Sequence, residues 1–341
     1  MSPPSGRHRP KPHHDSARRC EVVTQVMEDP HALEAIAPVG QGSVIGGYEL
    51  VAVLGTGGCG TVYEARHGVL GSRVAVKVLH EHVAESKEMV ERFLLEAQAV
   101  NWIRHPNIVD IRDVGGFRTG QPYLVMELLD GVHLGSLLER GALGPTEALD
   151  ILDPVCAAVE AAHRSGIVHL DLKASNIQIS DSAGVRRITL LDFGIAKLLE
   201  REPSASGLTA MSRKVGTPSS MSPEQIRGGP VDHRADIYAL GVLLFSMLTR
   251  RYPFESARSL DVERMHLDEP PPRPSDLVAV GADLDAVVLR CLAKDPADRF
   301  QSVPDFLAAL RAAATRAKRA ASSVREPREV HTGAIVLEIQ S

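Results

Sequence analysis

The feature that most constrains the fold is a change in hydrophobic periodicity near Leu134. Before it, short apolar runs separated by Gly-bearing turns predict strands, and only residues 86–101 have helical spacing, with Ser86 as a plausible N-cap. After it, apolar residues recur at helical spacing. The predicted strands are 48–55, 61–67, 72–79, 108–114 and 121–128, and the later helices are 145–166, 233–249, 283–292 and 303–315. This order predicts an α+β chain: a small antiparallel sheet carrying one main helix, then a larger, mostly helical part.

Both ends of the chain lack sustained periodicity. The N-terminal end mixes Pro, His, Arg and Gly, with one helical or strand-like patch at 22–27. The C-terminal end is basic and Pro-containing, and AIVLEIQ near its close could form one short strand. The predicted domain therefore covers 47–312, divided into 47–129 and 130–312, with tails at 1–46 and 313–341.

Composition excludes several functional classes. With 341 residues, 44% of them hydrophobic, the chain can bury two cores, and its net charge of −5 does not argue for a nucleic-acid partner. Four scattered cysteines form no metal-ligand spacing and predict reduced thiols in a cytoplasmic protein. The most apolar run, 239–248, is too short for a membrane span, which takes roughly 18–20 residues, so we expect a buried core helix there.

Three glycines, Gly55, Gly57 and Gly60, follow one predicted strand and precede another. A helix after such a run would indicate a dinucleotide-binding fold, whereas a strand indicates a hairpin whose backbone can approach phosphates closely. Taken alone, the run also fits a plain Gly-rich hairpin.

Lys77 lies in an otherwise apolar strand, where an ammonium group is costly unless it meets an anion. Glu96, on the helix that follows, could pair with it and hold it against phosphate oxygens. The alternative interpretation is two ordinary surface charges.

A second group of polar residues lies in VHLDLKASN (168–176) and in LDFG (191–194), which follows a short apolar strand predicted at 187–191. Asp171, Asn176 and Asp192 are oxygen donors of the kind that Mg²⁺ shares with substrate phosphates. Phosphoryl transfer needs a metal to offset phosphate charge and a carboxylate to orient the attacking hydroxyl. These residues therefore indicate phosphoryl-transfer chemistry.

Taken together, these motifs resemble the eukaryotic-type (Hanks-type) protein kinases, and more specifically the bacterial serine/threonine kinases. GxGxxGxV, VAVK, a helix Glu, HxDLKxxN, DFG, GTP…SPE, DIYALG and a late Arg follow in the family's order over residues 48–310. The resemblance implies a bilobal protein-kinase fold and a non-specific serine/threonine protein kinase that uses ATP with Mg²⁺, or Mn²⁺ in its place. It also implies protein substrates, autophosphorylation, partners that read phosphothreonine, and dimers formed through the small lobe.

The resemblance implies a role for each matching residue. Lys77 contacts the α- and β-phosphates and pairs with Glu96, behind the phosphate-covering glycines. Met126 is the gatekeeper before the hinge. Nucleotide-binding positions are Leu54, Gly55, Gly57, Gly60, Val62, Ala75, Lys77, Met126, Glu127, Leu129, Asn176 and Asp192.

For the catalytic positions, the resemblance implies that Asp171 is the catalytic carboxylate and Lys173 touches the γ-phosphate. Asn176 and Asp192 hold magnesium. Lys173 and Thr217 favour Ser/Thr over Tyr acceptors. Supporting roles are a Glu224–Arg299 pair, Asp236 bracing the catalytic loop, and an apolar stack of Val100, Ile111, His169 and Phe193.

The chain departs from the family at Leu170, where an Arg able to bind an activation-loop phosphate is usual. Leu cannot bind phosphate, but the residues that carry the chemistry are intact. We therefore predict an active kinase whose loop is not locked by an Arg–phosphate pair. Candidate loop acceptors are Ser204, Ser206, Thr209 and Ser212, and cations that could take over the role are Arg187, Arg213 and Lys214.

Further departures are less informative. Cys59 replaces a frequent aromatic at the glycine-loop tip and could be an exposed, nucleotide-gated thiol or simply a tolerated small residue. Thr24 and Thr332 are candidate autophosphorylation or docking sites. Two other functions stay open: a pseudokinase that binds nucleotide without catalysis, and a kinase-fold enzyme acting on small molecules.

Overall fold

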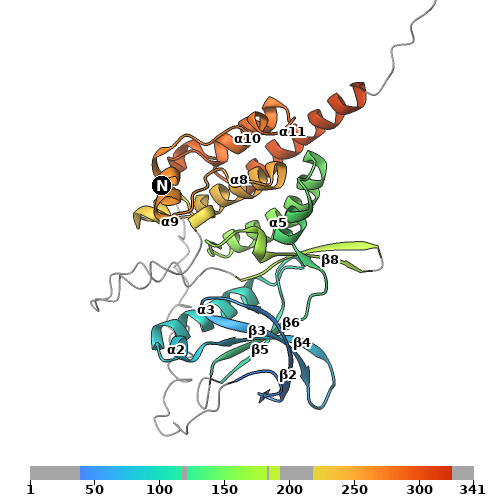
Figure 1. The fold of residues 1–341 in the computed structure, drawn as a ribbon, viewed down its shortest axis with the longest axis vertical. Coiled ribbons are helices and arrows are strands. Elements are labelled where there is room, and N and C mark those ends of the chain that lie inside the picture. Colours follow the sequence, from blue (N-terminus) through green and yellow to red (C-terminus); the bar gives the residue numbers. More distant parts are fainter. Residues whose placement is uncertain (1–38, 117–120, 183, 193–217, 325–341) are drawn as a thin grey trace, which may run out of the picture. The chain divides into compact units, whose positions relative to one another are not determined.

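The computed structural model describes residues 39–116, 121–182, 184–192 and 218–324. They divide into two compact units, each considered by itself (Figure 1). The small lobe comprises described residues up to 104 and 108–130. The large lobe comprises 105–107 and the described residues from 131 onward.

The small lobe is built on one antiparallel sheet of six strands in the order β1-β2-β3-β4-β6-β5. All five predicted strands are present, and β1 adds a sixth within the region assigned to the N-terminal tail. The strands are β1 Val44–Ile45, β2 Tyr48–Thr56, β3 Gly60–His67, β4 Arg73–Leu79, β5 Ile111–Gly115 and β6 Tyr123–Glu127.

Helix α3 (Lys87–Ile103) covers one face of this sheet, preceded by a single helical turn, α2 (Glu81–Ala84). Ser86 caps α3 as predicted, its hydroxyl accepting the Met89 backbone N–H at 3.4 Å. Phe93 and Ala97 of α3 pack against Leu124 of β6. The opposite face of the sheet has its own apolar cluster, which includes Leu50, Tyr63, Val76 and Val125. Side chains alternate between these faces along each strand.

Helices dominate the large lobe, as predicted. They are α4 Leu134–Arg140, α5 Pro145–Arg164, α7 Pro223–Arg227, α8 Arg234–Thr249, α9 Ser259–Asp268, α10 Ala282–Cys291 and α11 Val303–Val324. Residues 235–249 of α8 are all buried, which confirms the predicted core helix. Helix α11 packs on α5 and α10 and continues to Val324, so the predicted helix end at 315 is wrong, and the predicted tail boundary after 312 falls inside this helix. The patches at 22–27 and 334–340 lie outside the described residues.

A second sheet in the large lobe has the order β7-β8-β9, all antiparallel: Val132–His133, Ile177–Ser182 and Val185–Leu190. Only β9 was predicted. Strand β8 begins directly after the 3₁₀ turn η1 (Ala174–Asn176), and β9 ends just before Leu191 and Asp192. The hairpin therefore brings the two polar motifs of this lobe together.

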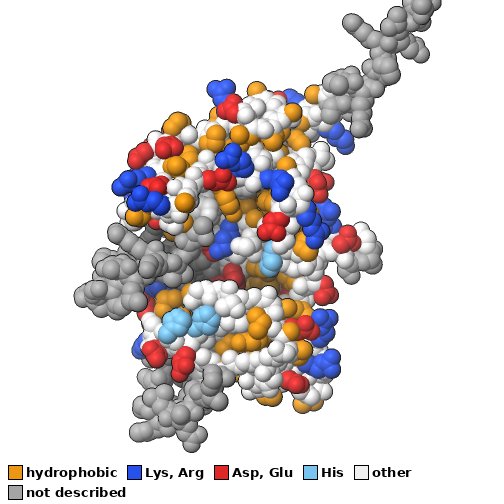
Figure 2. Space-filling view, in the orientation of Figure 1, with side chains coloured by type: hydrophobic (Ala, Val, Ile, Leu, Met, Phe, Trp, Pro, Cys, Tyr) orange, Lys and Arg blue, Asp and Glu red, His pale blue; other side chains and the backbone are white. Residues whose placement is uncertain are grey.

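No helix in the described part of the chain is long and apolar enough to cross a membrane. On the face of the large lobe shown in Figure 2, Lys and Arg side chains alternate with Asp and Glu. This face therefore presents no continuous field of one sign.

A buried histidine in the large lobe predicts how stability depends on pH. His266 of α9 is 0% exposed, its Nδ1 is 2.7 Å from the Tyr238 hydroxyl, and burial together with the Lys294 charge lowers its pKa to about 4. In the unfolded chain the His266 imidazole takes up a proton below about pH 6.5, whereas in the folded protein it does so only near pH 4. The free energy of unfolding should therefore decrease across that window, by about 2 kcal/mol at pH 4.5.

Urea unfolding at pH 7 and pH 4.5 measures this loss, and His266→Gln should reduce it. The matched control is His133→Gln, at an exposed position. An unchanged pH dependence in His266→Gln would show that His266 does not cause the loss.

Candidate active site

The glycine loop joins β2 to β3, and its glycines have different reasons to be there. A Cβ on Gly60 would lie 2.3 Å from the Val78 carbonyl oxygen, so the approach of β4 requires glycine at this position. A Cβ on Gly55 would meet nothing within 4 Å, and one on Gly57 only the Gly60 carbonyl oxygen at 3.9 Å. The plain-hairpin interpretation thus explains Gly60 alone. The bare backbone at Gly55 and Gly57 leaves room for a ligand.

Strand register places most of the predicted nucleotide-binding residues of the sheet on one face, whereas Glu127, which pairs with Val74, points to the other. Gly55 pairs with Val62, and Val62 pairs with Lys77. Ala75, two residues before Lys77, pairs with Met126. Paired residues point to the same face of a sheet, as do residues two apart. Leu54 falls instead at a register irregularity.

Lys77 and Glu96 form the predicted ion pair. Lys77 Nζ lies 3.9 Å from Glu96 Oε1, and the two side chains are only 15% and 12% exposed. The alternative of two ordinary surface charges is therefore wrong. An ammonium held this far from solvent and positioned by a carboxylate is suited to contact a phosphate anion.

The end of β6 supplies the predicted hinge. The Glu127 backbone N–H donates to the Asp110 carbonyl at 2.9 Å, and the Asp110 N–H donates to Glu127 Oε1 at 3.0 Å. Any adenine contact by the Glu127 backbone would therefore use its carbonyl oxygen. Leu129, two residues on, is half-buried.

In the large lobe, two side chains converge on one oxygen of Asp171. Lys173 Nζ lies 2.8 Å from Asp171 Oδ2, and Asn176 Nδ2 donates to the same oxygen at 3.1 Å and to the Asp171 carbonyl at 2.9 Å. The Asp171 side chain is 16% exposed. These contacts orient the carboxylate that sequence analysis assigned to the attacking hydroxyl.

Asn176 and Asp192 have the chemistry of a magnesium site. Because the Asn176 amide nitrogen binds Asp171, the amide oxygen is the atom that would face a cation. The Leu191 backbone N–H donates to the Asn176 carbonyl at 2.8 Å, which brings Asp192 beside the turn. Among the described residues, no group of three or more His, Cys, Asp or Glu could hold a metal. Two protein oxygens plus phosphates and water fit Mg²⁺, which is usually bound in this way.

Asp236 of α8 holds the catalytic loop from below, as predicted. It is 0% exposed, and its two oxygens accept the backbone N–H groups of His169 and Leu170, each at 2.8 Å. His163 Nε2 lies 2.7 Å from Asp236 Oδ2. A buried carboxylate with three donors fixes the backbone directly before Asp171.

His169 has a packing role, since it is 0% exposed and burial lowers its pKa despite the nearby carboxylates. Its Nε2 faces the Leu191 carbonyl at 3.2 Å, and its Nδ1 accepts the Asp171 N–H at 3.3 Å. These partners assign the proton to Nε2. The stack predicted to include His169 stays a prediction, because Phe193 lies outside the described residues.

Leu170 is 6% exposed, so it packs away without leaving a buried charge, as expected. Its backbone has a left-handed φ of 64°, which costs a residue with a side chain about 1–2 kcal/mol. Its carbonyl accepts a hydrogen bond from Gln225 Nε2 at 3.1 Å. The sequence does not indicate Gln225 as a site residue, because no local pattern predicts a contact between residues 55 positions apart.

Glu224 and Arg299 form the predicted pair, with two hydrogen bonds of 2.7 Å between them. Arg299 is 0% exposed. Burial alone would raise the pKa of Glu224, but the hydrogen bonds and charge of Arg299 outweigh it and lower the pKa. The pair ties α7 to the segment before α11.

Other predicted residues either lie in different surroundings than expected or fall outside the described part of the chain. Cys59 is half-buried and packs against the apolar cluster under α3, so the prediction of an exposed thiol is wrong. Arg187 of β9 donates to the Pro106 carbonyl at 3.2 Å. The remaining loop positions lie outside the described residues: Thr217, Ser204, Ser206, Thr209, Ser212, Arg213 and Lys214, together with Thr24 and Thr332 in the tails.

Comparison with known proteins gives a consistent result. The sequence matches the protein kinase domain family over residues 48–309. It is 43% identical over 288 residues to serine/threonine-protein kinase Pkn1 of Myxococcus xanthus, covering 83% of this chain and 40% of the relative. It is 41% identical over 278 residues to PknF of Mycobacterium tuberculosis, covering 80% of this chain and 57% of that protein. This chain therefore spans less than two thirds of the length of these relatives.

Among solved structures, a double mutant of the PknI kinase domain from Mycobacterium tuberculosis superposes with a TM-score of 0.66 at 30% identity. The match covers 82% of this chain and all of that one. The strand-built small lobe and the helical large lobe thus follow the same architecture.

Proposed function

The chain belongs to the protein kinase family, and we propose that it transfers the γ-phosphate of ATP to Ser and Thr hydroxyls of proteins, in bacterial signalling. The observation that carries the proposal is the Asp171 carboxylate, oriented by Lys173 and Asn176. A pseudokinase has no need of this arrangement. The proposed domain limits are those of the sequence analysis, extended to include β1 and the rest of α11.

Each residue has a defined task in this proposal. Asp171 accepts a hydrogen bond from the acceptor hydroxyl, orients the hydroxyl oxygen toward the γ-phosphorus and takes the hydroxyl proton, while the bond from the γ-phosphorus to the β–γ bridging oxygen breaks and ADP leaves. Lys173 offsets the charge that collects on the transferred group, and Lys77, held by Glu96, binds the α- and β-phosphates. Bound at Asn176 and Asp192, Mg²⁺ or Mn²⁺ would neutralise phosphate charge.

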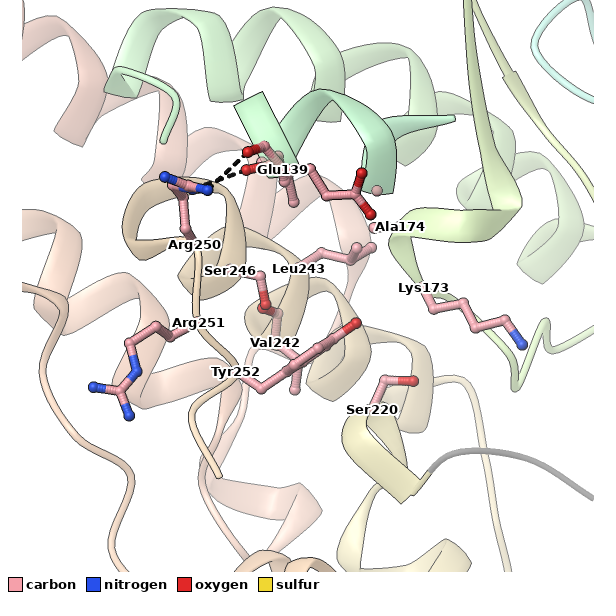
Figure 3. Close-up of a pocket in the computed structure, with 12 residues that line it drawn as sticks. Glu139, Lys173, Ala174, Ser220, Val242, Leu243, Ser246, Arg250, Arg251 and Tyr252 are labelled. Atoms are coloured by element: carbon pink, nitrogen blue, oxygen red, sulfur yellow. Dashed lines mark hydrogen bonds between the residues drawn. The ribbon is translucent and has the colours of Figure 1, made fainter. Parts of the chain in front are cut away.

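A pocket in the large lobe supports a polypeptide acceptor. It has a volume of about 330 Å³, and Lys173, the partner of Asp171, lies at its edge (Figure 3). Figure 3 shows Lys173 and Ser220 on one side and Arg250 and Arg251 on the other, with apolar side chains between them. The lining residues are Gly135, Leu138, Glu139, Lys173, Ala174, Ser220, Val242, Leu243, Ser246, Arg250, Arg251 and Tyr252. We take these charged and apolar groups beside Lys173 as the contact surface for part of a polypeptide acceptor.

The test is incubation with ATP radiolabelled on its γ-phosphate and a generic protein substrate, followed by phosphoamino-acid analysis. We expect label in phosphoserine and phosphothreonine. Label in phosphotyrosine would contradict the acceptor class. Nucleotide binding without transfer would indicate a pseudokinase, and transfer to small molecules alone would indicate a metabolite kinase.

The proposal includes autophosphorylation, partners that read phosphothreonine, dimers and a cytoplasmic location. Autophosphorylation has the simplest test, since a kinase that modifies itself incorporates label without added substrate. If the rate of incorporation per enzyme molecule does not change when the enzyme is diluted, the result would favour transfer within one molecule over transfer inside a dimer.

We expect activity to survive removal of the activation-loop acceptors. Leu170 offers no cation to a loop phosphate, and the catalytic loop is held by the buried contacts of Asp236 and Gln225 described above. The variant with Ser204, Ser206, Thr209 and Ser212 all changed to Ala should keep its initial rate within about threefold of wild type. A loss of about two orders of magnitude, nearly 3 kcal/mol in the barrier, would show that another cation binds a loop phosphate.

A further inference from the structure

Gln225 of α7 connects two segments of the large lobe that are far apart in sequence. Its amide oxygen accepts hydrogen bonds from the Ser222 backbone N–H at 3.0 Å and from the Ser222 hydroxyl at 3.1 Å. Its amide nitrogen donates to the Leu170 carbonyl at 3.1 Å. Gln225 is 4% exposed and Ser222 is 0% exposed. One neutral side chain thus binds the segment before α7 with its acceptor and the catalytic loop with its donor.

Leu170 is the residue through which this contact reaches the site. Asp236 holds its N–H and Gln225 its carbonyl, so side chains satisfy both backbone polar groups. The left-handed backbone is unfavourable for leucine and persists because the surroundings determine it. The carbonyl of Leu170 belongs to the peptide bond that leads into Asp171. A change in that peptide plane re-aims the Asp171 carboxylate, and small misplacements of a reacting group reduce rates strongly.

We propose that Gln225 is a positioning residue for Asp171, acting through its hydrogen bond to the Leu170 carbonyl. This inference rests on the proposed kinase function. The link consists of neutral groups, so it forms without an added phosphate. Gln225 supports the catalytic loop from α7, at the position where kinases of this family usually have an arginine.

Two variants of similar length separate the contacts. Gln225→Met keeps the volume and removes donor and acceptor, whereas Gln225→Glu keeps the acceptor toward Ser222 and removes the donor toward Leu170. We expect kcat to fall about tenfold in both, the effect of losing one hydrogen bond of about 1.4 kcal/mol in the transition state. The KM for ATP should stay within about twofold, because Lys77 and the glycine loop belong to the small lobe.

Ser222→Ala is the matched control. It removes one contact to the Gln225 amide oxygen and leaves both the Ser222 N–H and the Leu170 contact in place. Its kcat should stay within about twofold of wild type, because the donor that reaches the catalytic loop is unchanged.

The pH profile of Gln225→Glu gives a readout that a purely structural role would not change. A protonated carboxyl regains an O–H donor for the Leu170 carbonyl, and burial raises the pKa of such a carboxyl. The ratio of its kcat to that of wild type should therefore increase as the pH falls, while the ratio for Gln225→Met stays flat. Wild type and variant share the neighbouring titratable groups: Asp171 and His169 beside Leu170, Asp236 with His163, the Glu224–Arg299 pair, and His266 of α9, which packs on α7.

Each result has a defined meaning. If the wild type is active and both Gln225 variants keep kcat within twofold of the wild-type value, the inference is overturned and the proposed function stays intact. A wild type that transfers no phosphate overturns the proposed function, and the inference with it. If circular dichroism shows that both Gln225 variants fail to fold while Ser222→Ala folds, Gln225 is structural, and the positioning role is wrong.

Discussion

Replacing Asp171 by Asn should lower the rate of phosphoryl transfer by about a thousandfold, the usual scale for loss of a positioned general base. An amide cannot take the proton of the acceptor hydroxyl. It would also set an N–H₂ group or a neutral oxygen against Lys173 and Asn176, which now contact the charged Oδ2. The loss should appear in kcat, since the Asp171 contacts act on the transition state.

ATP affinity is the internal control for this variant. The residues assigned to the nucleotide in the small lobe are unchanged, so Kd for ATP should stay within about threefold in calorimetry. Asp181→Asn, which removes an exposed carboxylate from β8 of the same lobe, should leave the rate near wild type. Equal rates in the Asp171 and Asp181 variants would assign the measured transfer to a contaminating kinase.

Replacing Arg299 by Ala should destabilise the protein by about 3–5 kcal/mol, the usual cost of removing one partner from a buried ion pair. Arg299 is 0% exposed and holds both oxygens of Glu224 at 2.7 Å. It also donates to the carbonyl groups of Ala293, Arg234 and Lys294. Removing it leaves a buried carboxylate and these carbonyls without their donor, as chemical denaturation should show.

Arg311→Ala is the matched control, because Arg311 also contacts a carboxylate, that of Asp153, at 2.7 Å. These side chains are 55% and 42% exposed, so water replaces the lost contact and Tm should change little. Equal losses in the two variants would show that burial does not set the effect. The lowered pKa of Glu224 sets the direction in which the stability contributed by the pair depends on pH. The pair stabilises the folded protein above the ordinary carboxyl pKa range, and this contribution is lost as the pH falls through the lowered pKa.

The parts of the site that follow from short-range patterns could be predicted from the sequence. Ser86 caps α3 because the capping residue and the Met89 N–H that donates to it lie three residues apart. The Lys77–Glu96 pair was predictable because an apolar strand followed by a helix leaves a buried ammonium few partners. The Glu224–Arg299 and Asp236 contacts came from family resemblance, and the structure confirms both.

Features that depend on tertiary packing could not be predicted. Gln225 looks like an ordinary polar helix residue, and its contact with Leu170 spans 55 positions of sequence. The left-handed backbone of Leu170 has no sequence signal, because leucine rarely adopts it. The end of α11 was misplaced because its last turns are polar and basic, a composition equally typical of a tail. Cys59 was expected at an exposed tip, whereas the loop turns it toward the apolar cluster under α3.

The central claim is that a catalytic loop with leucine beside its aspartate transfers phosphate. The most direct test is the single-turnover rate with γ-labelled ATP, Mg²⁺ and a protein acceptor, using Asp171→Asn as background. The account predicts protein-bound label on Ser and Thr at a rate about a thousandfold above this background. Wild-type protein that binds ATP and labels protein no faster than Asp171→Asn would contradict it.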